Sequence, residues 1–600
     1  MLEATPTQNR LQLRNGDFST LTEALDYAAQ GETGYNFYNG KGQLDYVLPY
    51  AQLREDAIAI AKRLMGLGIK RGSRVALVAD TDPGFLQLFY ACQYAGMVPV
   101  PLPASLRLGG HTTYVAQLKR LLMYCRASVA IAPEAYLSFL SEAAENLPLS
   151  YIGSANSLLA LPEGNAELTP SGPDELAYLQ YTSGSTRFPR GVMITNRTVM
   201  NNLGHIVRNG VKIRPGDRAI SWLPYYHDMG LVGLVLSPMA AQVSVDYFRT
   251  RDFAMRPRLW LSLITKNKAT ISFSPPFGFE LCMQRLRASD LDKYDLSSWR
   301  VAGVGAETIR AQPLLAFAEQ LAPSGFNPGA FLACYGMAEC SLAVSFSPLG
   351  QGIQVDEIEA ETLAMTQRAF PALKPTNRSM NAKEFVKCGF ALPGHAVEVR
   401  DKDGSTLPDR HVGTLYVKGP SVMAGYFGEE ELSREILSSD GWLNTGDLAY
   451  IADKSIIITG RQKDLIIING RNIWPQDLEY LAENQPEVRT GDASAFSVAG
   501  ADGEDKAVLV IECRASQVEK RSALVDTLQG LVCSELGIEC YIELVPRNTL
   551  PRTTSGKLSR SGAKRDFLQR VANGQTEPPG INIEACNYQQ SILKSAVGQS

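Results

Sequence analysis

The sequence lacks the features that would place it in several special classes of protein. Its ten cysteines include no Cys-x-x-Cys pair, which argues against a zinc cage and a disulfide scaffold. The net charge is only −4, and lysines and arginines form no long block, so we expect no nucleic-acid partner. No secretory-type apolar segment follows the first methionine, and the longest apolar run, 229–245, contains Pro238 and falls short of the about 18 residues that a membrane span needs. We therefore expect a cytoplasmic protein with reduced thiols and no membrane span.

The first half of the sequence has the alternation of an α/β protein. Apolar residues from Leu53 to Leu67 recur at helical spacing. We expect short apolar strands at 74–79, 97–100, 128–132 and 177–180, and a buried helix and strand within 229–245. Helices alternating with such strands cover both faces of a mostly parallel sheet. Since 600 residues exceed one core, the chain is expected to form three or four domains or subdomains.

The second half of the sequence differs from the first in its polarity and in its pattern of expected strands. The segment 351–387 is polar, shows few clear strands and is long for a loop in a compact domain. Short strands between 413 and 458 suit a small barrel-like subdomain, and a charged turn at 460–464 marks a domain boundary. After it we expect a compact α+β unit with strands at 493–499, 506–512 and 541–545 and a helix at 516–536.

The stretch YTSGSTRFPRG, residues 181–191, is a candidate phosphate loop. It does not fit the Gly-x-x-x-x-Gly-Lys-Ser/Thr pattern of a Walker loop. Backbone N–H groups of such a Gly- and Ser-rich turn can form an anion nest, and hydroxyl groups and arginines add donors and charge suited to phosphate oxygens. The alternative is an ordinary solvated turn.

Four further stretches follow this loop in a recognisable order. They are CYGMAE (334–339), NTGDLAY (444–450), GRQKD (460–464) and PRTTSGK (551–557). With the loop at 181–191, they make the sequence resemble the adenylate-forming enzymes: acyl-CoA synthetases, luciferases and nonribosomal-peptide adenylation domains. The resemblance runs to about residue 570.

The resemblance implies a large domain at 1–459, made of two Rossmann-like βαβ sheet subdomains and a small β-barrel subdomain. It implies a hinge at 460–464, a small mobile α+β domain at 465–575 and a polar tail at 576–600. Arg187 and Arg190 replace the usual glycine and lysine of the loop. With the insertion-like segment 351–387, this departure resembles the fatty acyl-AMP ligases, in which such an insertion is thought to restrain rotation of the small domain.

The activity implied is ATP- and Mg²⁺-dependent conversion of a medium- or long-chain fatty acid into an acyl-adenylate, with transfer of the acyl group to the phosphopantetheine of an acyl carrier protein. No carrier attachment motif follows Lys557, so we expect the carrier to be a separate chain unless this sequence is part of a longer one. One alternative is a fatty acyl-CoA ligase on the same scaffold. Another is a nucleotide-binding regulatory protein that has lost catalysis.

Three residues are the expected catalytic groups. Two anions, a carboxylate and the α-phosphate of ATP, must approach each other, and the ammonium of Lys557 could stabilise them. Glu339 is the expected magnesium ligand, with Thr186 as a second, because Mg²⁺ favours few carboxylates together with phosphate oxygens and water. His227 resembles the gate near the acyl carboxylate; the alternative is a core histidine paired with Asp228.

The same motifs imply the nucleotide-binding residues. They are Thr182, Ser183, Gly184, Ser185, Thr186, Arg187, Arg190, Gly305, Ala306, Glu307, Tyr335, Gly336, Met337, Ala338, Asp447, Arg461 and Lys463. Tyr335 would stack on adenine, and the acceptor-only carboxylate of Asp447 could bind both ribose hydroxyls. Lys463 would lie at the hinge. Candidate walls of the acyl pocket are Trp222, 229–234 and 273–281, but they do not indicate a chain length.

Overall fold

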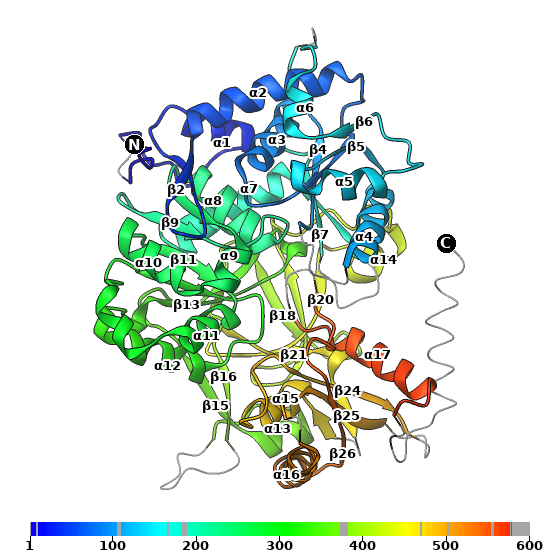
Figure 1. The fold of residues 1–600 in the computed structure, drawn as a ribbon. Helices are drawn as coiled ribbons and strands as arrows, with labels where there is room; N and C mark the ends of the chain where they lie inside the picture. Colours follow the sequence, from blue (N-terminus) through cyan, green and yellow to red (C-terminus); the bar gives the residue numbers. More distant parts are fainter. Residues whose placement is uncertain are drawn as a thin grey trace.

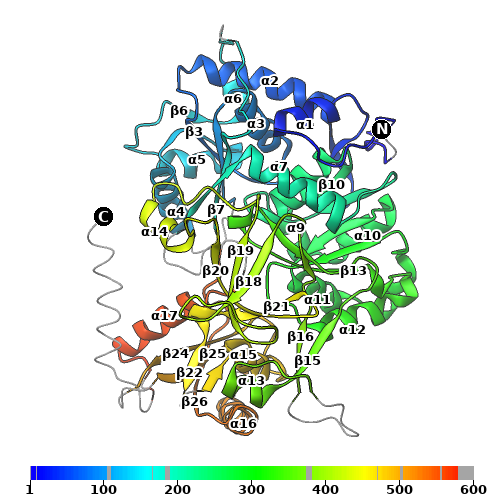
Figure 2. The same cartoon turned by 180° about the vertical axis from the view of Figure 1, so that it is seen from behind.

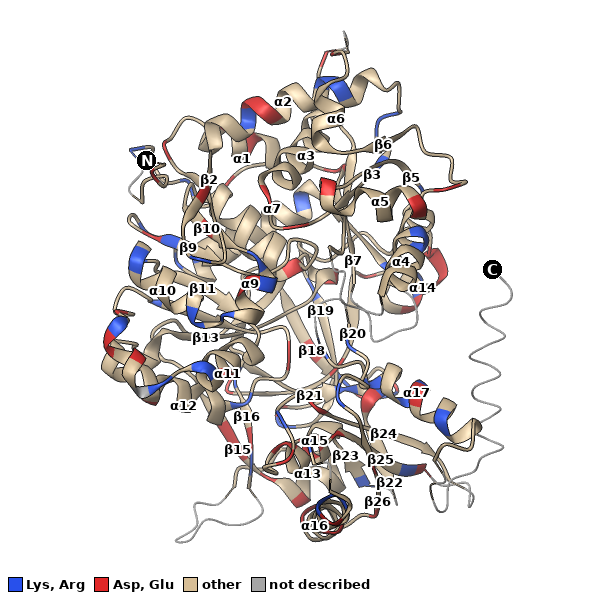
Figure 3. Cartoon of the chain, viewed as in Figure 1, with Lys and Arg blue, Asp and Glu red and all other residues tan. Residues whose placement is uncertain are grey.

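A computed structural model describes residues 2–7, 10–104, 110–164, 167–182, 189–372, 382–468, 471–500, 505–515, 517–553, 557–576 and 578. The chain has the predicted α/β architecture: a large N-terminal domain lies above a small C-terminal one in Figure 1. The boundaries 1–459, 460–464 and 465–575 stay predictions. Positively and negatively charged residues are interspersed along the ribbon of both domains (Figure 3).

The main sheet of the large domain has nine strands. In spatial order they are β17 (Phe390–Ala391), β14 (Ala343–Phe346), β13 (Phe331–Gly336), β12 (Val301–Val304), β11 (Ile271–Ser274), β9 (Arg218–Ser221), β10 (Ser244–Phe248), β1 (Gly34–Tyr38) and β2 (Leu44–Pro49). The strands from β13 to β1 are parallel, whereas β2, β14 and β17 pair antiparallel at the edges. The prediction of a mostly parallel sheet is therefore confirmed.

A second sheet is wholly parallel, as predicted, and consists of β4 (Val98–Leu102), β3 (Arg74–Val78), β5 (Ala127–Ile131) and β6 (Tyr151–Gly153). The predicted strand at 177–180 does not join it by hydrogen bonds. It is β7 (Leu176–Tyr181), which pairs antiparallel with β8 (Gly191–Thr195). The candidate phosphate loop is thus the connection of a hairpin.

Helices surround these sheets. They are α1 (Leu21–Ala28), α2 (Tyr50–Gly66), α3 (Pro83–Tyr94), α4 (Gly110–Tyr124), α5 (Glu134–Ala143), α6 (Ala155–Leu159), α7 (Asn196–His205), α8 (Ser237–Ala240), α9 (Thr250–Met255), α10 (Arg258–Asn267), α11 (Pro276–Arg285) and α12 (Ala311–Leu321). The apolar run at 229–245 forms a buried π-helical segment, Met229–Leu236, followed by α8 and the start of β10. This confirms the predicted helix and strand.

The predicted barrel is a sheet in the structure. Strands β18 (Ala396–Arg400), β19 (Gly413–Lys418), β20 (Leu443–Ala452) and β21 (Ser455–Arg461) pair antiparallel in sequence order. No closing pair joins β18 to β21 among the described residues, so the expectation of a barrel is corrected to an open four-stranded sheet. It lies between the upper part of the large domain and the small domain (Figure 2), with α14 (Glu430–Ile436) in the β19–β20 connection.

The polar segment 351–387 is more regular than its sequence suggests. It contains a hairpin of β15 (Val355–Glu359) and β16 (Ala382–Val386), with α13 (Ala360–Thr366) in the connection. In β15 Asp356 and Ile358 are buried and Glu357 is exposed, and in β16 Phe385 and Val386 are buried. The hairpin connection at 373–381 lies outside the described residues.

The small domain has apolar clusters of its own between residues 466 and 571. Its elements are β22 (Ile466–Ile468), β23 (Arg471–Ile473), α15 (Pro475–Glu483), β24 (Ala493–Ala499), β25 (Asp505–Glu512), α16 (Val518–Leu536), β26 (Cys540–Val545) and α17 (Arg560–Ala572). The three strands and the helix predicted there are confirmed.

The described cysteines are all unpaired, and most of them are buried. Within the described residues, no helix is both long and apolar enough to cross a membrane.

Candidate active site

A cleft of about 1890 Å³ lies between the two domains. Its walls come from the ends of β12 and β13, the base of the β7–β8 hairpin, strands β20 and β21, and the segment that precedes α17. The carboxyl ends of parallel strands are where α/β sheets usually bind their ligands. Thr182 and Lys557, which are 375 residues apart in the sequence, therefore face one cavity.

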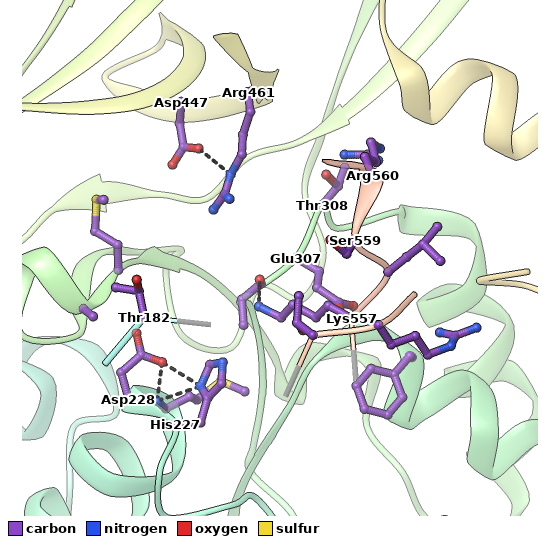
Figure 4. Close-up of a pocket in the computed structure, with 18 of the residues that line it drawn as sticks. Thr182, His227, Asp228, Glu307, Thr308, Asp447, Arg461, Lys557, Ser559 and Arg560 are labelled. Carbon is purple, nitrogen blue, oxygen red and sulfur yellow. Dashed lines mark hydrogen bonds and ion pairs between the residues drawn. The ribbon is translucent and has the colours of Figure 1, made fainter. Parts of the chain in front are cut away.

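Lys557 extends from the small domain into this cleft (Figure 4). Its ammonium donates a hydrogen bond to the carbonyl oxygen of Ala306, at 2.5 Å, in the large domain. Burial lowers the pKa of Lys557, while the nearby carboxylates of Glu307 and Asp228 favour its charged form. The cation is thus already placed among the groups predicted to bind the nucleotide.

Ala306 has an unusual backbone conformation for this contact. Its φ of 69° lies in the left-handed region, which residues with a side chain rarely adopt. Glu307 follows it, and burial raises the pKa of that carboxyl although Lys557 opposes the shift. Ala306 and Glu307, both predicted to bind the nucleotide, line the cleft, and Gly305 lies directly before them, after the end of β12.

Asp447 is buried at the side of the cleft that β20 forms. One carboxylate oxygen accepts a hydrogen bond from the phenol of Tyr335 at 2.7 Å, and the other lies 3.1 Å from Nε of Arg461. Figure 4 shows this ion pair facing the space in front of Lys557. Tyr335, Asp447 and Arg461, which were predicted from three separate motifs, are therefore in direct contact.

The segment after β13 carries the proposed metal carboxylate. Gly336 is required there, because a Cβ atom would lie 1.9 Å from the carbonyl oxygen of Leu342. The tight turn directs Glu339 into the cleft, where its carboxylate accepts a 2.7 Å hydrogen bond from the phenol of Tyr426. Met337 and Ala338 line the same wall.

Glu339 is suited to binding a divalent cation. It is only 9% exposed, and burial raises the pKa of its carboxyl, a cost that a bound cation would offset. No group of three or more His, Cys, Asp or Glu side chains in the described part of the chain is arranged to hold a metal ion by itself. One carboxylate beside phosphate oxygens nevertheless matches the chemistry that Mg²⁺ favours.

His227 and Asp228 form a pair on the opposite wall of the cleft (Figure 4). The ring Nδ1 of His227 lies 2.7 Å from the carboxylate of Asp228. Burial alone would raise the pKa of Asp228, but His227 and Lys557 outweigh it and lower that pKa. The pairing considered as an alternative for His227 is present, and it lies within the cleft rather than in the core.

The phosphate loop is described only at its base. Thr182 and Arg190 line the cleft, and the backbone N–H of Thr182 donates to the carbonyl of Arg190 at 3.0 Å. The guanidinium of Arg190 lies 5.4 Å from the ring centre of Tyr426. The predicted residues Ser183, Gly184, Ser185, Thr186 and Arg187 lie outside the described residues. Lys463 lines the cleft at the predicted hinge.

Sequence reasoning missed two side chains of the cleft that bind neighbouring carboxylates. Tyr426 binds Glu339, but a tyrosine in a glycine-containing turn gives no signal for that role. Arg560 binds both oxygens of Glu479 at 2.7 Å and also pairs with Asp464 of the hinge at 3.1 Å. The sequence signal available for Arg560 was its position three residues after Lys557, at the start of a helix.

Comparisons with known proteins agree with this arrangement. A family model described as "AMP-binding enzyme" matches residues 29–427. A Caulobacter vibrioides protein named "Putative acyl-CoA synthetase" is 46% identical, over 94% of this chain and 98% of its own length. The medium-chain fatty acid–acyl-carrier-protein ligase JamA of Moorena producens is 31% identical, over 92% of this chain and 96% of its own.

A solved structure from a study of fatty acyl-adenylate ligases of E. coli and L. pneumophila superposes with a TM-score of 0.88. It is 46% identical to this chain and covers 94% of it, and the match spans 100% of the solved chain.

Proposed function

The chain belongs to the AMP-binding enzyme family of adenylate-forming ligases, and from this premise we propose that it activates a medium- or long-chain fatty acid and passes the acyl group to an acyl carrier protein. The observation that carries the first step is the position of Lys557. Its ammonium crosses from the small domain to Ala306, in the same cleft as Asp447 and Glu339.

In the first half-reaction a carboxylate oxygen of the fatty acid attacks the α-phosphorus of ATP. The bond to the bridging oxygen breaks, pyrophosphate leaves, and an acyl-adenylate remains. Lys557 stabilises the two approaching anions. Asp447 binds the ribose, and Arg190 stabilises the leaving pyrophosphate. Mg²⁺ bound at Glu339 would supply further positive charge at the phosphates.

In the second half-reaction the thiol of phosphopantetheine attacks the acyl carbonyl carbon. The carbon–oxygen bond to the phosphate breaks, AMP leaves, the thiol proton is lost to solvent, and a thioester forms. JamA, whose name specifies an acyl carrier protein as acceptor, supports this choice of acceptor.

The insertion supports the same choice. Ile358, Leu363 and Phe385 share an apolar cluster with Trp474 of the small domain. The ammonium of Lys383 lies 4.4 Å from the ring centre of Trp474 and 2.6 Å from the carboxylate of Asp477. These contacts hold the small domain against the large one and oppose the rotation that reaction with free coenzyme A requires.

A second candidate, fatty acyl-CoA ligase, is favoured by the name of the 46% identical Caulobacter protein. The two candidates share the first half-reaction and differ only in the acceptor thiol.

Two assays test the proposal. Fatty acids of about 8 to 18 carbons, ATP and Mg²⁺ are incubated with hydroxylamine, which should trap the adenylate as a hydroxamate. The enzyme is then offered equal concentrations of coenzyme A and of a carrier protein bearing phosphopantetheine. We expect hydroxamate with the preferred acids and acyl-carrier as the main thioester. Acyl-CoA as the main product would establish the second candidate, and no hydroxamate with any acid would refute adenylation of fatty acids.

A further inference from the structure

The loop between β12 and α12 touches the small domain at both of its ends. At one end the carbonyl of Ala306 accepts the hydrogen bond from Lys557. At the other end, four residues later, Nη1 of Arg310 donates a 2.7 Å hydrogen bond to the carboxylate of Glu483 on α15. One short loop thus connects the catalytic lysine to a charged contact between the domains.

The contact between Arg310 and Glu483 is shielded from water. The side chain of Glu483 is 7% exposed and that of Arg310 is 29% exposed. The guanidinium of Arg310 also lies 5.3 Å from the ring centre of Tyr480, one helical turn before Glu483. The second carboxylate oxygen of Glu483 accepts a 2.7 Å hydrogen bond from the backbone N–H of Gly491, which fixes its orientation.

A second carboxylate completes the arrangement. Glu280 on α11 is near both Arg310 and Glu483, and it hydrogen bonds with Thr490 of the small domain. Burial raises the pKa of Glu280, while the charge of Arg310 lowers it. Arg310 therefore lies among the carboxylates of Glu280, Glu483 and Glu479, which together raise its own pKa despite burial.

We propose that Arg310 is a positioning residue that, through Glu483, holds the small domain in the orientation in which Lys557 reaches the reacting phosphate. The contact exists only while α15 faces the start of α12, so any rotation of the small domain must break it. Rotation would separate Arg310 from Glu483 and break an ion pair that is shielded from water. The pair therefore favours the orientation for adenylation over any other. The pair stabilises the first half-reaction and contributes nothing to the second.

The test measures the two half-reactions separately, and it relies on the proposed transfer to a carrier for the second. Adenylation is followed by pyrophosphate release in hydroxylamine, and transfer by acylation of carrier protein from supplied acyl-adenylate. Arg310→Ala and Glu483→Gln should lower kcat of adenylation about tenfold. They should leave KM for ATP and the transfer rate within about twofold of the wild type. Arg285→Ala, an exposed arginine at the end of α11, is the matched control and should leave both rates unchanged.

A charge reversal separates positioning from a direct role of Arg310 in binding substrate. Arg310→Glu alone should be at least as slow as Arg310→Ala, and adding Glu483→Arg should recover several-fold of the lost adenylation rate. Equal losses in both half-reactions, unchanged adenylation in Arg310→Ala, or no recovery in the reversed pair would each overturn the proposal. If the wild type forms adenylate but acylates no carrier, the proposed acceptor is wrong, and the recovery experiment still decides the role of Arg310.

Discussion

The ammonium of Lys383 lies 2.6 Å from the carboxylate of Asp477 and so joins the inserted hairpin to the first turn of α15. The same ammonium lies over the ring of Trp474. Trp474 in turn packs against Gly460 of β21, where a Cβ atom would lie 3.0 Å from the indole. Through Trp474, the insertion thus reaches Gly460, the first residue of the segment predicted to be the hinge.

Removing this contact should widen the choice of acceptor. We expect Lys383→Ala and Trp474→Ala to form acyl-CoA faster than the wild type, by about three- to tenfold, because a cation–π contact with an ion pair contributes on the order of 1 kcal/mol. Thioester formation with coenzyme A is measured by chromatography. Lys387→Ala is the control, because Lys387 pairs with Asp453 inside the large domain. Equal acyl-CoA formation in all four proteins would show that the contact does not restrain the small domain.

Replacing Lys557, the proposed catalytic lysine, should separate the rate of adenylation from nucleotide binding. Lys557→Ala should lower the rate of adenylation by about 10²- to 10³-fold, since a preorganised charge at the reacting anions is lost. Affinity for ATP, measured by calorimetry, should change less than about threefold because Asp447 and Glu339 remain. Lys520→Ala on the exposed face of α16 provides the control. Wild-type turnover in Lys557→Ala would remove the basis of the proposed mechanism.

The pH dependence of adenylation should report the environment of Lys557. Burial lowers its pKa below the ordinary 10.5, against the opposing effects of Glu307 and Asp228. Because the ammonium is the active form, the rate should fall as pH rises through this lowered pKa. In Lys557→Arg the residual activity should persist to higher pH, since a guanidinium stays protonated. A pH profile of kcat/KM for both proteins checks this, and coincident alkaline limbs would contradict it.

The ribose contact can be tested with a modified nucleotide. Asp447→Ala should lower kcat/KM for ATP about tenfold or more, the effect of losing hydrogen bonds to a charged acceptor. The wild type should also use 2′-deoxy-ATP poorly, whereas Asp447→Ala should discriminate little between the two nucleotides. Asp453→Ala, which removes an exposed carboxylate from the β20–β21 turn, should behave as the wild type. Undiminished discrimination in Asp447→Ala would place the ribose elsewhere.

Asp82 offers a stability prediction away from the cleft. Its carboxylate caps α3 by accepting from the backbone N–H of Phe85, and burial together with the charge of Asp80 raises its pKa from 3.8 to about 6. A raised pKa means that the folded state holds the proton up to a higher pH than the unfolded state does. The free energy of unfolding therefore falls as pH rises from about 4 to 6 and stays lower above that range. At neutral pH the charged carboxylate of Asp82 lowers the free energy of unfolding by at most about 3 kcal/mol.

Asp82→Asn keeps the capping oxygen and removes the buried charge. It should therefore unfold at a higher temperature than the wild type at neutral pH and at nearly the same temperature at pH about 4. Thermal unfolding at the two pH values measures the difference. A variant that is destabilised equally at both would show that the charged form of Asp82 is needed in the native state.

Local sequence patterns predicted the helices and strands well, because the formation of these elements depends on residues that are close together in the sequence. The apolar spacing of Leu53, Ala57, Ile60 and Leu64 predicted α2, and the strand at 493–499 matches β24 residue for residue. The sequence does not predict the hairpin of the insertion, because charged residues, including the buried Asp356, interrupt the apolar pattern of β15 and β16. Short strands and turns at 413–458 predict a small barrel, whereas the structure has an open sheet, because local patterns do not determine whether the two edge strands pair.

The sequence by itself determined which chemical groups are present: a lysine in a Ser-Gly loop, an acidic residue after a tight turn, and a carboxylate in Thr-Gly-Asp. Only the tertiary structure decided which of them meet. Arg310 and Glu483 are separated by 173 residues, and Lys383 and Asp477 by 94, and neither pair has a sequence pattern of its own. Such contacts depend on how two separately folded domains are oriented, and surface charges acquire partners only when that orientation brings them within hydrogen-bonding distance.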